Sequence, residues 1–90
     1  MPKFIIEREL PGAGDLSADE LQSISEKSNQ VIATLGPEIR WLQSYVTDDK
    51  LYCVYVAPDA DIIFEHARCG GFPADKVTRV STVIDPSTGD

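Results

Sequence analysis

The chain is poor in cysteine, histidine and basic residues, and each shortage excludes some classes of function. Cys53 and Cys69 lack CxxC spacing and are too few for a disulfide framework, so a reducing cytoplasm is the expected compartment. Eight Lys and Arg residues stand against fifteen Asp and Glu residues, for a net charge of −7. This charge argues against a nucleic-acid partner, disfavours an anionic membrane and attracts cations.

Long apolar runs are also absent. No segment approaches the length that a membrane-spanning helix needs, and a Met-Pro-Lys start followed by a strand pattern is not typical of a signal peptide. With 42% hydrophobic and 26% charged residues, the composition is that of an ordinary globular protein. Ninety residues are expected to form a single domain.

Two predicted helices have clear start and stop signals. Ser17 and Glu20 form an S-x-x-E capping box before an apolar stripe, and Gly36-Pro37 ends this first helix. Pro58-Asp59 starts the second helix, with Asp59 as its N-cap, and Gly70-Gly71 stops it.

Four predicted strands complete the chain. They are rich in β-branched and aromatic residues or alternate in polarity, and they span Lys3–Glu9, Ile39–Thr47, Lys50–Ala57 and Val77–Asp85. Asp48-Asp49 predicts a two-residue hairpin loop. The order β-α-β-β-α-β predicts a ferredoxin-like α+β fold, a four-stranded antiparallel sheet with two helices on one face. We expect this domain over residues 1–86 and a flexible tail over 87–90.

Two helices cover only one face of such a sheet, so the composition of the other face matters. A two-residue loop places Tyr45 on the same face as Tyr52, and we expect the helices to cover that face together with Phe4 and Ile6. The uncovered face would then carry Glu7, Leu42, Ser44, Val46, Leu51, Cys53, Tyr55, Arg79, Ser81 and Val83. A face so rich in apolar residues predicts a homodimer joined through it around a polar pocket.

The second helix carries the candidate metal ligands. His66, the only histidine, and Cys69 are three residues apart and share a helix face, and Glu65 lies on a neighbouring one. Imidazole, thiolate and carboxylate groups suit nickel, zinc or copper, so this trio predicts a metal site that a second segment, a second subunit or water would complete. The alternative for His66 is a partly buried histidine that makes one hydrogen bond.

A second group of residues offers a pocket for a small molecule on the predicted uncovered face. Glu7, Cys53, Tyr55 and Arg79 would line it, with the Glu7 carboxylate as a general base or metal ligand. The alternative is that Glu7 and Arg79 neutralise each other across neighbouring strands. Cysteine catalysis is not expected, because the only histidine would project from the opposite side of the sheet from Cys53.

Four blocks of the sequence carry a resemblance to a known family. They read MPKFIIERELPGAG, WLQSYVTDDKLYCVYVAP, EHARCGGFP and VIDP. From Pro2 to about Pro86 the chain closely resembles a family of small bacterial domains of unknown function, some of whose members are described as nickel-binding proteins. The resemblance implies a ferredoxin-like fold, a homodimer and nickel binding. Its best-matching block around a ligand is Glu65-His66.

These observations support two hypotheses. The first is a small cytoplasmic, dimeric protein that binds or sequesters a divalent metal, with nickel as the ion, and does not catalyse a reaction. The second is a small-molecule-binding protein or enzyme of the dimeric α/β-barrel kind. A deep cavity on the uncovered sheet face would favour the second hypothesis, and a filled face would favour the first.

Overall fold

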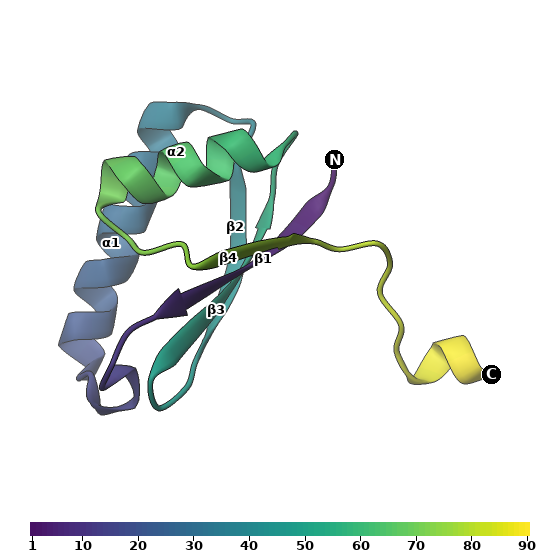
Figure 1. Ribbon diagram of the computed structural model, residues 1–90, viewed down its shortest axis with the longest axis horizontal. Helices are drawn as coiled ribbons and strands as arrows, with labels where there is room; N and C mark the ends of the chain where they lie inside the picture. The colour runs from purple at the N-terminus through teal and green to yellow at the C-terminus, as the bar shows by residue number, and fades with distance from the viewer.

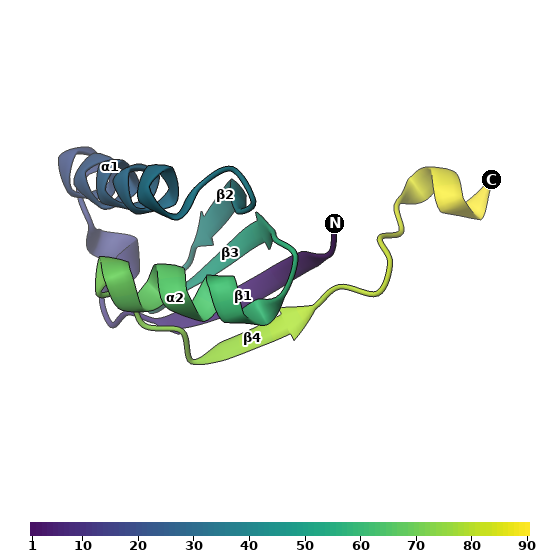
Figure 2. The same ribbon diagram turned by 90° about the horizontal axis from the view of Figure 1, so that it is seen from above.

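The computed structural model describes residues 1–90 and contains one four-stranded antiparallel sheet with both helices on the same face (Figures 1 and 2). The strands, in the spatial order β2-β3-β1-β4, are β1 (Lys3–Glu9), β2 (Arg40–Val46), β3 (Lys50–Val56) and β4 (Lys76–Arg79). The helices are α1 (Ala18–Leu35) and α2 (Ala60–Gly70), and the two 3-10 turns are η1 (Ala13–Asp15) and η2 (Pro86–Gly89). The predicted ferredoxin-like α+β fold is confirmed.

Both helices are capped by the residues that the sequence signals indicated. Ser17 Oγ accepts the backbone N–H of Glu20, and the Glu20 carboxylate accepts the backbone N–H of Ser17, each at 3.1 Å. The Asp59 carboxylate accepts the backbone N–H of Ile62 at 3.1 Å. Gly71 ends α2 with a φ of 68°, a left-handed conformation that favours glycine. Neither helix is both long and apolar enough to cross a membrane.

The β2–β3 hairpin has the predicted register at its turn and a β-bulge further along. Tyr45 pairs with Tyr52, as the two-residue loop requires, and the N–H of Thr47 donates to the carbonyl of Lys50 at 2.9 Å. The register shifts after Trp41, so Leu42 has no cross-strand partner. The extra residue shifts by one position which side chains of β2 face the helices.

The predicted assignment of the two sheet faces is wrong for β2, for β3 and for Arg79 on β4. Ile6 pairs with Cys53, Phe4 pairs with Tyr55, and all four side chains are buried in the core between the sheet and the helices. Directly opposed residues of an antiparallel pair project to the same face. The helix-covered face therefore includes Ser44, Val46, Leu51, Cys53, Tyr55 and Arg79, which pairs with Phe4. The uncovered face includes Tyr45, Tyr52, Val54 and Val56. Both faces of β3 are apolar, so alternation alone did not reveal which one the helices cover.

The last strand is shorter than predicted, and the chain then leaves the sheet (Figure 1). Arg79 pairs with Phe4, and the N–H of Val80 donates to the carbonyl of Lys3 at 2.8 Å. β1 begins at Lys3, so residues after Val80 soon run out of partners. The predicted strand is wrong beyond Arg79, and η2 with an Asp85 cap follows. In this extended segment Val83 is 64% exposed and Ile84 75% exposed.

Candidate functional site

A cavity of about 70 Å³ lies between α1, the β2–β3 hairpin and the segment that follows α2. Its walls are mostly apolar and include Leu21, Ile24, Trp41, Leu51 and Phe72. Cys53 and Tyr55, two of the residues predicted to line a pocket, are in its wall. They lie under the helices and not on the uncovered sheet face where the sequence analysis placed them.

Arg8 on β1 provides the charged group of this cavity and is only 3% exposed. Its guanidinium donates to the carbonyl of Pro73 and, at 3.5 Å, to the hydroxyl of Tyr55. Its Cζ lies 6.0 Å from the ring centre of Tyr55 and 5.6 Å from that of Phe72. The three ion pairs of the structure are Lys50–Glu7, Lys50–Glu9 and Arg68–Glu65, so Arg8 is buried without a carboxylate partner.

Sequence reasoning missed Arg8, although a signal was present. Phe4, Ile6 and Arg8 alternate along β1 and all three are buried, whereas Ile5 is exposed. Alternate side chains of a strand project to the same face, so an arginine two residues beyond a buried apolar residue points toward the core. Arginine is rarely buried without a partner, so this position pointed to a special environment.

His66 on α2 is enclosed beside the cavity, in contact with the same aromatic side chains. Its ring is 0% exposed, its Nε2 lies 3.3 Å from Ser28 Oγ on α1, and its Nδ1 has no hydrogen-bond partner. Its ring centre is 5.3 Å from that of Tyr55 and 5.7 Å from that of Phe72. Burial, followed by the charge of Arg8, lowers the pKa of His66, and burial raises the pKa of Tyr55. Both side chains are therefore neutral at pH 7.

The structure does not bring the three predicted metal ligands together. The His66 ring faces the core, whereas Cys69 is exposed and its Sγ lies 3.6 Å from a Glu65 carboxylate oxygen. That carboxylate also pairs with Arg68, whose hydrogen bond lowers the pKa of Glu65. No group of three or more His, Cys, Asp and Glu side chains in the chain is placed to hold a metal ion. The trio therefore does not fit a metal within one chain, and ligation by His66 stays a prediction.

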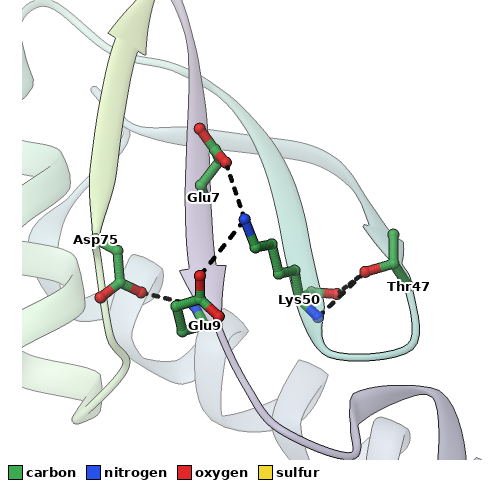
Figure 3. Close-up of polar contacts among 5 residues, drawn as sticks. All are labelled: Glu7, Glu9, Thr47, Lys50 and Asp75. Atoms are coloured by element: carbon green, nitrogen blue, oxygen red, sulfur yellow. Dashed lines mark hydrogen bonds and ion pairs between the residues drawn. The ribbon is translucent and has the colours of Figure 1, made fainter.

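Glu7 lies on the uncovered sheet face, away from Cys53 and Tyr55. Lys50 Nζ is 3.7 Å from the Glu7 carboxylate and 3.4 Å from that of Glu9 (Figure 3). The charge of Glu9 is the main cause that raises the pKa of Lys50. The partner of Glu7 is thus Lys50 and not Arg79. The predicted pocket of Glu7, Cys53, Tyr55 and Arg79 is consequently divided between the two faces of the sheet.

The remaining predicted site residues are Arg79 on β4 and Cys53 on β3. Arg79 is exposed and opposite Phe4, at the end of the sheet. Cys53 and His66 project to the same side of the sheet, contrary to the sequence-based expectation, because the helices cover the opposite face of β3 from the one expected. No hydrogen bond joins the Cys53 thiol to the His66 ring, whose only side-chain partner is Ser28.

The fold and the cavity define a small ferredoxin-like α+β domain with a space between its helices and its sheet. The chain belongs to the family described as nickel responsive protein SCO4226-like, whose model matches residues 4–80. A crystal structure of SCO4226 from Streptomyces coelicolor A3(2) has the same fold, with a TM-score of 0.77 and 16% sequence identity. The match covers 91% of this chain and 99% of that one. None of the curated proteins matches the sequence.

Proposed function

We propose that this protein is a non-catalytic, nickel-responsive protein that binds Ni²⁺ or a similar divalent ion as a cytoplasmic homodimer. The observation that carries this proposal is the membership of residues 4–80 in a family described as nickel responsive. The net charge of −7 supports it, because a negative surface raises the local concentration of cations. Nickel also stands high in the affinity order of divalent ions for nitrogen, oxygen and sulfur donors.

The ion would need donors beyond those that one chain assembles. Glu65 and Cys69 are the predicted ligands that solvent reaches, and their side chains already lie 3.6 Å apart. His66 could join them only if its ring left the enclosed position beside Ser28 and the cation of Arg8. A second copy of the chain, or water, would supply the remaining positions around the ion.

The uncovered sheet face supports the dimer that this proposal needs. Ile5 is 39% exposed and Tyr45 57% exposed on this face, which no helix covers (Figure 2). Tyr52, Val54 and Val56 extend the same apolar surface along β3. The C-terminal segment, which extends away from the body (Figure 1), adds Val83 and Ile84, most of whose surface is open to solvent. A second copy packed face to face would bury this surface and could bury that segment.

Nickel titration by calorimetry tests the proposal and separates the donors. We expect the wild-type protein to bind Ni²⁺ and the double variant Glu65→Gln/Cys69→Ser to bind it at least ten times more weakly. The matched control is Glu26→Gln/Ser23→Ala on the exposed face of α1, which should keep the wild-type affinity. A wild-type protein that shows no nickel binding would contradict the proposal. Equal affinity in wild type and His66→Ala would remove His66 from the ligand set.

A further inference from the structure

We propose that the cavity under α1 is a binding site for a short-chain monocarboxylic acid, whose carboxylate pairs with the Arg8 guanidinium and whose apolar tail lies against Leu21 and Ile24. This site is separate from the proposed nickel chemistry, because its charged group is a cation. It goes beyond metal binding by assigning a second ligand to the chain.

The first support is the uncompensated charge of Arg8. A guanidinium stays protonated under all physiological conditions, and a buried charge without a counter-ion is costly. Arg8 is 3% exposed, yet its neighbours are the neutral Tyr55, the neutral His66 and the ring of Phe72. Aromatic faces compensate only part of this charge. An anionic ligand would supply the missing partner.

The second support is the number of donors that Arg8 leaves free. A guanidinium carries five N–H groups arranged as a planar fork. The carbonyl of Pro73 and the hydroxyl of Tyr55 accept from its two terminal nitrogens, Nη1 and Nη2. These two bonds leave three N–H groups without a protein partner. A carboxylate can accept two such groups side by side, which is the strongest arrangement for this pair of groups.

The size and lining of the cavity define the rest of the ligand. Its volume is about 70 Å³. An engineered apolar cavity that binds benzene has about twice this volume, ~150 Å³. Leu21, Ile24, Leu51 and Phe72 in its wall favour a hydrocarbon group over the several polar oxygens of a phosphate or sugar. Val46, 43% exposed, is in the same wall, so the cavity reaches the surface beside β2. A carboxylate and its first carbon match this volume and polarity, and the end of a short tail would extend into the opening beside Val46.

The test compares butyrate with butyramide, a neutral molecule of nearly the same shape, by protein-observed NMR titration. Wild type should bind butyrate at least ten times more tightly than butyramide, with the largest shifts at Arg8, Tyr55 and Ile24. Arg8→Met should lose this preference while still accepting butyramide. Arg68→Met, which removes an exposed arginine outside the cavity, should behave as wild type. Equal affinity for the two probes, or no binding of either at about 100 mM, would overturn the proposal.

A second pair of variants keeps the test decisive if Arg8→Met does not fold. Ser25 is in the cavity wall on α1, and Ser25→Leu should fill the space and abolish butyrate binding with Arg8 intact. Ser23→Leu, on the exposed face of the same helix, should leave butyrate affinity unchanged. Unaltered butyrate binding in Ser25→Leu would place the carboxylate outside the cavity and contradict the proposal. Nickel binding in any of these proteins has no bearing on the outcome.

Discussion

Ser28 Oγ on α1 lies 3.3 Å from His66 Nε2 on α2, so a single buried hydrogen bond joins the two helices above the sheet. The other ring nitrogen, Nδ1, is buried without a partner. A charged imidazole here would lie beside the Arg8 guanidinium, which is why burial and that neighbouring charge together lower the pKa of His66. The helix pair is therefore built around a neutral histidine.

This neutral histidine makes the stability of the fold depend on pH. The pKa of His66 is lower in the folded state than its ordinary value of 6.5, so the unfolded chain binds more protons in the interval between the two values. The free energy of unfolding should therefore fall as the pH drops from 7 through about 6.5 and below. In His66→Gln this part of the pH dependence should be absent. Urea unfolding of both proteins at several pH values measures the difference, and parallel curves would contradict the prediction.

The contact between Gly70 and Phe72 predicts a stability cost for a very small substitution. A Cβ atom on Gly70 would overlap the ring of Phe72, which packs against His66 and Arg8. Gly70→Ala should therefore destabilise the fold by about 1–3 kcal/mol through overpacking, although alanine is the better helix former. Gly89→Ala, where a Cβ meets no atom, serves as the control in the same thermal melts. A Gly70→Ala protein as stable as wild type would show that the ring can move at no cost.

The capping box at the start of α1 should contribute measurably to stability. Ser17→Ala removes the oxygen that accepts the backbone N–H of Glu20, which should lower the free energy of unfolding by about 1 kcal/mol. Ser23→Ala, at an exposed position within the same helix, should change it little or raise it slightly. Chemical denaturation of the two variants distinguishes a lost cap from a general effect of removing serine.

The proposed dimer predicts that charges on the uncovered sheet face, and not those on the exposed face of α1, disrupt association. Ile5→Asp and Val54→Asp place carboxylates at directly paired positions of β1 and β3. Each should convert a dimer into a monomer, because a charge buried in the interface would have no partner. Asn29→Asp on α1 should leave the dimer intact. Light scattering at micromolar concentration measures the mass, and a wild-type mass of 9.9 kDa would contradict the dimer.

Much of the fold was predictable because its signals are local. The Ser17 capping box, the Asp59 cap and the Gly71 stop each act within one helical turn, and all three are formed in the structure. The Tyr45–Tyr52 register also followed from the length of one loop. Local signals of this kind do not require knowledge of the rest of the chain.

The site was harder to predict because it depends on which face of the sheet the helices cover. Cys53 and Tyr55 are in the cavity wall, but the sequence placed them on the wrong face, since both faces of β3 are apolar. The Leu42 bulge further changed the alternation of β2. Their spacing places His66 and Cys69 on the same helix face, yet His66 is buried and Cys69 is exposed.

An anomalous-scattering map from crystals soaked with nickel, recorded at the nickel absorption edge, would show directly whether this chain holds the ion. We expect a strong peak bound by side chains of this chain, with donors from a second copy or water around it, and two copies joined through the uncovered faces of their sheets. Two results would contradict the proposal. One is the absence of a nickel peak in crystals soaked at saturating nickel. The other is packing that leaves Ile5 and Val54 open to solvent in every copy.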